Sequence, residues 1–242
     1  MEPRLRRLAE AVPGWFAIQN TDGDIIGDAH PRDTIWEANG IRLRIFSRSD
    51  RLGAAEVTPG TLLPVRCAER HIQADQTFCL GLDALPVETG DDAKVWWTHM
   101  EQWLQVQSIA AQTGRWPAHH ALDHGHAGEL QLAAQNLAAE LDLTEEYAQA
   151  HADKPSWITD RTLGIAFDDG KPMNGRLACP EGCTKGRRRR PVLRRKCKKR
   201  AGIARLVALE RERRRALDQF WASERLLGRG CCGTMLSCPL RT

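Results

Sequence analysis

One cysteine in a polar stretch is the residue best suited to nucleophilic chemistry in this chain. Cys79 follows Asp75, Gln76 and Thr77, and these polar neighbours indicate an exposed loop, where a reactive thiol has to lie. An accessible thiolate can attack an acyl group and hold it as a thioester. The alternative is an ordinary buried thiol, since free cysteines are among the most buried residue types. The exposure of Cys79 separates the two interpretations.

Metal binding is a second chemistry open to the residues just before this cysteine. Cys67, Glu69 and His71 all have side chains that can bind zinc. Such a site could be completed from a histidine cluster further along the chain, at His119, His120, His124 and His126. The same histidines could instead cap the following helix, pack against Trp116, or assist Cys79 as acid or base. The residue pattern leaves these alternatives open.

Most of the remaining cysteines lie near the C-terminus. They are Cys179, Cys183, Cys197, Cys231, Cys232 and Cys238. In a reducing compartment such density favours a metal site over disulfides. Four of these six thiolates would close one tetrahedral structural zinc site. The alternative is a set of unpaired thiols in a disordered basic tail.

The same C-terminal segment carries the positive charge of the chain. Residues 179–242 contain 19 Lys and Arg but only 5 Asp and Glu, although the whole chain has a net charge of only +4. This asymmetry indicates a separate module that docks on an acidic partner or on nucleic acid. The run from Lys185 to Arg200 suits phosphate groups, but no aromatic side chain interrupts it for base stacking. Protein docking or solvated charge is therefore the favoured use, and nucleic acid is the alternative.

Length and composition fit a main domain followed by a small module. The chain has 242 residues, of which 42% are hydrophobic and 27% charged, as in ordinary globular proteins. We expect a main domain over residues 1–150, a connector over 151–178 and a cysteine-rich module over 179–242. No apolar run reaches the roughly 18 residues that span a bilayer, and the first fifteen residues lack the apolar stretch of a secretory signal. We expect no membrane association and a cytoplasmic protein.

The elements that must position Cys79 are predicted mainly from hydrophobic periodicity. A short amphipathic helix over 4–11 precedes strands over 14–20 and 24–28, which the Asp22-Gly23 turn joins. Alternation over 41–48 predicts a third strand, and residues 62–67 a fourth. Helices are expected over 95–114, 127–143 and 201–227. The expected fold is α+β, with a four-strand antiparallel meander followed by helices and a small, mainly helical module of zinc type.

This order of elements resembles that of ubiquitin-conjugating enzymes, in the divergent form found in bacteria. That family's signature is His-Pro-Asn-Ile, followed seven residues after the Ile by the catalytic cysteine in an Ile-Cys-Leu context. Here Glu69-Arg70-His71-Ile72 is followed by Phe78-Cys79-Leu80 with the same spacing, and Pro64 matches the family's proline-containing strand entry. The resemblance covers approximately residues 1–150.

The resemblance implies an enzyme that receives a ubiquitin-like modifier on Cys79 and transfers it to an amine. His71 stands where the family has the Asn that stabilises the oxyanion, and a ring N–H can donate the same hydrogen bond. The implied partners are an adenylating activating enzyme, the modifier and a deconjugating metallopeptidase, in a system linked to phage defence. The alternative is a non-catalytic binding module of the same fold, whose zinc-binding tail recognises a protein or nucleic acid.

Overall fold

The computed structural model describes residues 1–48, 51–81, 85–160 and 197–241. They form two compact units, Met1–Ala121 with Glu224–Thr242, and Leu122–Ser223. The domain boundaries expected at residues 150 and 178 stay predictions, and residue 178 lies outside the described residues. Each unit contains its own hydrophobic core. Within the described ranges, no helix is both long and apolar enough to cross a membrane.

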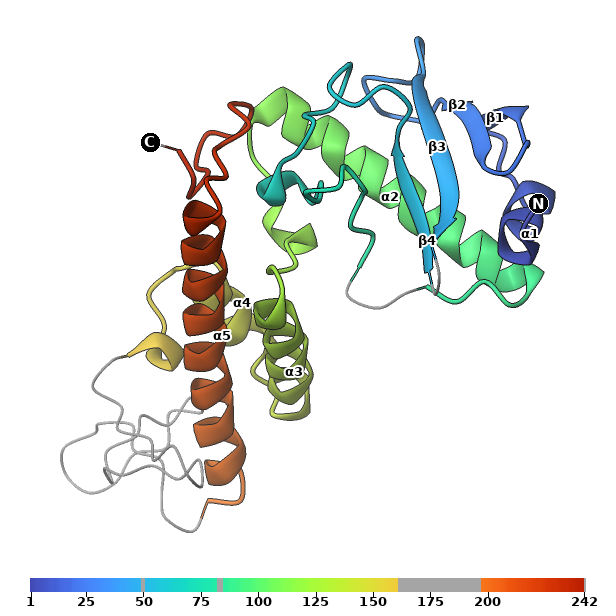
Figure 1. Cartoon of the computed structure of the whole chain (residues 1–242). Coiled ribbons are helices and arrows are strands. Elements are labelled where there is room, and N and C mark those ends of the chain that lie inside the picture. The colour runs from blue at the N-terminus through green and yellow to red at the C-terminus, as the bar shows by residue number, and fades with distance from the viewer. Residues whose placement is uncertain (49–50, 82–84, 161–196, 242) are drawn as a thin grey trace, which may run out of the picture. The chain divides into compact units, whose positions relative to one another are not determined.

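An antiparallel sheet with its strands in chain order forms the centre of the first unit (Figure 1). Its strands are β1 (Phe16–Asn20), β2 (Ile25–Ala29), β3 (Ile41–Arg48) and β4 (Arg51–Glu56). Along β3, buried Ile41, Leu43 and Ile45 alternate with exposed arginines, as the sequence predicts. One face of the strand therefore meets the core while the other meets water.

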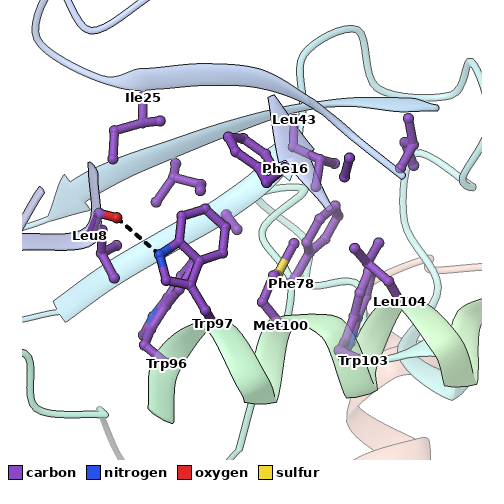
Figure 2. Packing of buried hydrophobic residues seen from close by; sticks show 14 of the residues in the cluster. Leu8, Phe16, Ile25, Leu43, Phe78, Trp96, Trp97, Met100, Trp103 and Leu104 are labelled. Atoms are coloured by element: carbon purple, nitrogen blue, oxygen red, sulfur yellow. Dashed lines mark hydrogen bonds between the residues drawn. The ribbon is translucent and has the colours of Figure 1, made fainter. Parts of the chain in front are cut away.

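Helix α1 (Pro3–Glu10) and the long helix α2 (Gly90–Thr113) flank the sheet of this unit and confirm the predicted α+β fold. These helices pack on each other and on the sheet (Figure 1). The indole N–H of Trp97 donates to the backbone carbonyl of Leu8 at 3.0 Å, and this bond fastens the two helices together (Figure 2). Along α2, Trp96, Trp97 and Trp103 are buried in this core together with Met100 and Leu104, and their burial stabilises the packing of the helix on the sheet.

Helix α2 begins earlier than the apolar periodicity indicates. Its N-cap is Thr89, whose hydroxyl accepts from the Asp92 backbone N–H at 3.2 Å. The Asp92 carboxylate in turn accepts from the Thr89 backbone N–H at 2.8 Å. This reciprocal capping box satisfies backbone donors of the first turn and sets the start at Gly90.

The predicted fourth strand over residues 62–67 is wrong, because the sheet takes Arg51–Glu56 as β4 instead. The buried carboxylate of Glu56 accepts backbone N–H groups from Gly60, Leu62 and Leu63 at 3.2, 2.7 and 3.3 Å. These bonds fold the following segment around Glu56 and use the donors that a strand would need for its ladder.

The described part of the second unit is helical. It contains α3 (His126–Glu140), α4 (Thr144–His151) and α5 (Arg200–Leu226), the last of which extends into the first unit from Glu224. Its core is formed by buried apolar residues, among them Ala134, Ala138, Leu141, Tyr147, Ile203, Leu206 and Val207. Helix α4 is absent from the predicted elements, because only Tyr147 and Ala150 of its eight residues are buried and too few apolar positions remain to show a period.

Charged groups of α5 are also part of this second unit. The Glu210 carboxylate, whose side chain is 1% exposed, accepts from Arg213 Nε at 2.7 Å and from Arg214 Nε at 2.6 Å. Arg213 pairs in addition with Asp123. A buried carboxylate needs such partners, because an unpaired one would cost several kcal/mol.

Burial lowers the pKa of His124 to about 4, against the smaller opposing effect of Asp123. The ring of His124 stacks on Phe220 with centroids 4.7 Å apart and meets Trp221 edge-on at 5.2 Å. The folded protein therefore holds this ring neutral at pH 7 and disfavours its protonation.

We expect the free energy of unfolding to fall as the pH drops from 7 to 5. The unfolded His124 takes up a proton below its ordinary pKa of 6.5, whereas the folded one takes it up only near 4. The stabilisation is complete above pH 6.5 and is lost between these two values, by about 1 to 2 kcal/mol at pH 5. Urea unfolding at both pH values measures it. In His124→Gln this part of the pH dependence should vanish, whereas it should persist in the exposed control His126→Ala; equal slopes for His124→Gln and the wild type would contradict the assignment.

Candidate functional site

The segment that carries the signature is a backbone-closed loop. Cys67 and Ile72 exchange backbone hydrogen bonds of 3.1 and 2.9 Å around the short turn η1 (Ala68–Arg70). The Phe78 backbone N–H then donates to Ala54 of β4 at 2.8 Å. Both ends of the loop are thus tied to main chain, so its conformation does not depend on flexible side chains.

Cys79 lies beside His71 at the outer face of this loop. Its backbone N–H donates to the His71 carbonyl at 2.9 Å, and its thiol lies 3.5 Å from the Gly81 carbonyl. The preceding Phe78 is buried and stacks on Trp103 of α2, with ring centroids 4.0 Å apart (Figure 2). Because successive side chains of an extended segment point to opposite sides, a buried Phe78 leaves the cysteine half-buried and reachable from solvent.

A hollow adjoins Cys79 on the side of the β3–β4 hairpin. Its lining includes Arg48, Arg51, Gly53, Leu80 and Gly81. Arg51 supplies positive charge to its wall, whereas Arg48 is paired with Asp75. The wall is open at Gly81, while the Phe46 ring fills the space beside Gly53. The hollow can therefore receive a narrow segment with an acidic group next to the Cys79 thiol.

An acidic side chain orders the turn next to this hollow. Asp75 accepts from the Thr77 hydroxyl at 2.6 Å and from the Thr77 backbone N–H at 3.1 Å, and it pairs with Arg48. Burial alone would raise the pKa of Asp75, but the bonds from Thr77 and the Arg48 guanidinium together hold that pKa below its usual value. Asp75 is therefore a charged anchor for the turn rather than a proton donor at neutral pH.

The second signature residue, His71, is also well held. Its backbone is left-handed, with φ 52° and ψ 39°, at the end of η1. The side chain is only 9% exposed and its ring lies on Trp116, with centroids 4.8 Å apart. The structure thus brings the backbones of His71 and Cys79 together and packs the imidazole on an aromatic neighbour.

The histidine cluster divides between the two units. His120 belongs to the first, where its carbonyl accepts from the Trp116 indole N–H at 3.1 Å. His124 packs in the second unit as described above, and His126 pairs with Glu129 in the first turn of α3 at 2.8 Å. The side chain of His119 lies outside the described residues.

Arg70 is a site residue that the sequence reasoning missed. It is 2% exposed, and burial lowers the pKa of its guanidinium. Its Nε donates to Gln107 Oε1 at 2.8 Å, its Nη2 donates to the Gln107 carbonyl at 3.2 Å, and the Gln107 amide donates back to the Arg70 carbonyl. One feature of the sequence indicated a buried polar partner: Gln107 is a polar residue at a position where the helical period of α2 predicts a buried, apolar one.

Three of the six C-terminal cysteines, Cys231, Cys232 and Cys238, lie near Cys67 of the loop. Cys67 Sγ lies 2.9 Å from Cys232 Sγ, and Cys231 contacts the thiol of Cys238. Cys197 instead packs against the core of the second unit, and Cys179 and Cys183 lie outside the described residues. No group of three or more His, Cys, Asp or Glu side chains within the described ranges is already arranged to hold a metal ion.

The Cys67–Cys232 contact shifts the pKa values of the two thiols in opposite directions. Donation from Cys67 to Cys232, followed in importance by burial, raises the pKa of the Cys67 thiol. The same hydrogen bond is the main cause that lowers the pKa of Cys232 to about 5. Burial raises the pKa of Cys238 to about 11. The hydrogen bond therefore makes Cys232 the more acidic thiol of the pair.

Two family models match the chain and together span nearly all of it. Residues 15–118 match the prokaryotic E2 domain, and residues 123–240 match a cysteine-rich domain C-terminal to the E2 domain. The chain is a prokaryotic E2 domain followed by a cysteine-rich domain. The expected relationship to bacterial conjugating-type proteins with a cysteine-rich tail is confirmed. No curated protein and no solved structure matches the chain.

The boundary between these family models falls close to that between the compact units, apart from the C-terminus. The E2 model ends at residue 118, and the first unit continues to Ala121 before it takes up residues from Glu224 onward. The end of the cysteine-rich domain therefore packs with the E2 domain. Its backbone contact is the bond from the Leu236 N–H to the Gly114 carbonyl, at 2.8 Å.

We expect Gln107→Ala to lower the free energy of unfolding of the full chain by about 2 to 4 kcal/mol, because it removes a principal partner of a buried cation. Urea unfolding followed by tryptophan fluorescence measures this loss. Gln102→Ala, at an exposed position of the same helix, is the matched control and should change stability by less than about 0.5 kcal/mol. Equal losses in the two variants would show that Arg70 does not depend on Gln107.

Proposed function

We propose that this E2 protein accepts a ubiquitin-like modifier as a thioester on Cys79 and transfers it to an amine. In the first step the Cys79 thiolate attacks the modifier's thioester on an activating enzyme, whose own thiolate leaves. In the second step a neutral amine attacks the Cys79 thioester, a carbon–nitrogen bond forms, the carbon–sulfur bond breaks and Cys79 leaves as thiolate. The proton lost by the amine passes to solvent, and neither step changes an oxidation state.

The observation that carries this proposal is the placement of Cys79. The thiol is half-buried on a loop whose backbone is fixed by Ile72 and Ala54, and it borders the hollow that contains Arg48 and Arg51. A nucleophile needs such a rigid and accessible position, because misplacement of the reacting atoms reduces the rate. A purely structural thiol would gain nothing from facing this hollow.

The hollow itself supports an extended C-terminal segment as the group transferred. The wall at Gly81 offers little side-chain obstruction, and Arg51 attracts an acidic residue of the modifier. The partners in this proposal are the ubiquitin-like modifier and an adenylating activating enzyme. A deconjugating metallopeptidase would remove the modifier from its target. The biological role proposed for this modification is phage defence.

His71 is proposed as the second group of the reaction. Its position matches the oxyanion-stabilising Asn of the conjugating enzymes, and an imidazole N–H is a comparable donor. A left-handed backbone and contact with Trp116 hold the residue in place. In this role it would lower the barrier to attack by the amine while contributing little to loading.

A structural zinc ion in the cysteine-rich domain is also part of the proposal. The excess of Lys and Arg in this domain supports docking on an acidic protein surface, with nucleic acid as the alternative. A non-catalytic binding module remains the second candidate, and the observation that favours it is the packed histidine at the position of the family's Asn.

Cys79→Ser should form a reductant-stable adduct with the modifier, because an oxygen ester resists attack by amines far more than a thioester does. The test combines the protein with a candidate activating enzyme, modifier and ATP, followed by reducing and non-reducing gels. The wild-type adduct should disappear on addition of a thiol reductant. Cys79→Ala is the matched control and should form neither adduct. A reductant-sensitive adduct on Cys79→Ala would place the thioester on another cysteine.

His71→Ala should leave loading of Cys79 intact and slow transfer to an amine by roughly 10² to 10³, the usual effect of removing one oxyanion donor. His71→Asn should restore transfer, since Asn tolerates a positive φ and donates the same type of hydrogen bond. Single-turnover discharge of the loaded protein measures both. If loading and melting temperature fall together in His71→Ala, the residue is structural or binds metal with Cys67 and Glu69. Unchanged discharge in His71→Ala would contradict the oxyanion role.

A further inference from the structure

Four cysteines from two distant parts of the chain gather in the first unit. Cys67 opens the signature loop, and Cys231, Cys232 and Cys238 follow helix α5. The sulfurs of Cys67 and Cys232 lie 2.9 Å apart, Cys231 contacts the thiol of Cys238, and Cys238 also acts electrostatically on Cys67. Cysteines separated by 165 residues thus converge on one place.

A main-chain N–H group acts on each of these four sulfurs. The Gly233 N–H donates to Cys231 Sγ at 3.3 Å. The backbone N–H groups of Arg70, Thr234 and Leu240 favour the thiolate forms of Cys67, Cys232 and Cys238, respectively. Each of these N–H groups follows its cysteine by two or three residues, so four local turns present N–H groups to sulfur. Such bonds stabilise thiolates and orient them as ligands, whereas a neutral buried thiol packs as a small apolar group without them.

The charges around the cluster suit a metal ion bound by four thiolates. A divalent ion with four thiolates has a net charge of about −2. Arg70 is buried beside the cluster and hydrogen-bonds Thr234 at 3.4 Å. Arg66 also interacts electrostatically with Cys67. Because Arg66 is also paired with the Glu224 carboxylate, the Arg70 guanidinium is the main group that compensates the excess negative charge, which would otherwise oppose burial.

The contact between Cys67 and Cys232 is closer than a tetrahedral site requires. A zinc–sulfur distance of about 2.3 Å places ligand sulfurs about 3.8 Å apart. The four thiols now form two contacting pairs, and the described residues include no preformed metal-binding group. Binding must therefore separate the Cys67 and Cys232 sulfurs. Residues 228–240, which contain no helix or strand, can make this adjustment without breaking a regular element.

We propose that Cys67, Cys231, Cys232 and Cys238 bind one structural zinc ion that fastens the end of the cysteine-rich domain to the catalytic loop of the E2 domain. This ligand set specifies the zinc site proposed above and is independent of thioester chemistry at Cys79. It takes one ligand from outside the cysteine-rich domain and leaves out Cys197. The ion would hold Cys67, the residue from which the chain enters η1 and reaches His71.

The test measures zinc in full-length protein purified under reducing conditions, by elemental analysis and by release to a colorimetric chelator. We expect about one zinc per chain that is lost from Cys67→Ser and from Cys232→Ser. Cys197→Ser is the matched control and should retain its zinc. After replacement of zinc by Co²⁺, the wild type and Cys197→Ser should show the visible absorption of tetrahedral cobalt–thiolate, and the two ligand variants should lose it.

Circular dichroism of each variant separates ligand loss from unfolding, and Cys232→Ser, at a partly exposed position, provides a second variant if Cys67→Ser does not fold. Full zinc content in folded Cys67→Ser or Cys232→Ser would overturn the proposal. So would metal-free wild type whose peptide map contains a Cys67–Cys232 disulfide. Loading of Cys79, measured separately, distinguishes failure of the zinc site from failure of the conjugating function.

Discussion

The buried pairing of Arg70 with Gln107 is the interaction on which the site depends. A guanidinium that is 2% exposed needs nearly all of its donors satisfied inside the protein, and a side chain and a carbonyl of α2 supply most of the acceptors. Because Gln107 also donates back to the Arg70 carbonyl, the turn η1 is attached to the helix through both backbone and side chain. Cys67 precedes this anchor and His71 follows it, so one interaction positions the residues of both proposed sites.

The aromatic core determines which way the cysteine faces. Phe78 is held between the sheet and α2 by its stack on Trp103, and its backbone is bonded to β4. The next residue must then point away from the core, toward the hollow near Arg48 and Arg51. Exposure of the candidate nucleophile is thus a consequence of burying its neighbour, and large aromatic side chains make that burial strongly favourable.

Part of the positive charge of the C-terminal half is used inside the second unit. Arg213 and Arg214 are bound to the buried Glu210, and Arg213 also to Asp123. Arg213 is itself buried, whereas Arg214 is partly exposed. Lys199 is bound to the Leu141 carbonyl and Asp142. These cations stabilise the helical unit instead of being free to attract a polyanion. Counting charges along the sequence therefore overstates the surface offered to nucleic acid, because it does not distinguish internal pairs from solvated groups.

The sequence by itself determined the elements whose signals are local. The alternation in β3, the apolar stripe of α2 and the spacing from Ile72 to Cys79 predicted the α+β fold, the candidate nucleophile and its family. Tertiary structure decided the rest, because the competing forces act between distant residues. The Glu56 carboxylate accepts the backbone N–H groups of Gly60, Leu62 and Leu63, so the predicted fourth strand does not form. Arg70 hydrogen-bonds Gln107 of α2, and Cys67 contacts Cys232, which is 165 residues away in the sequence. Periodicity contains no information about such partners, since each contact depends on where the chain returns after folding.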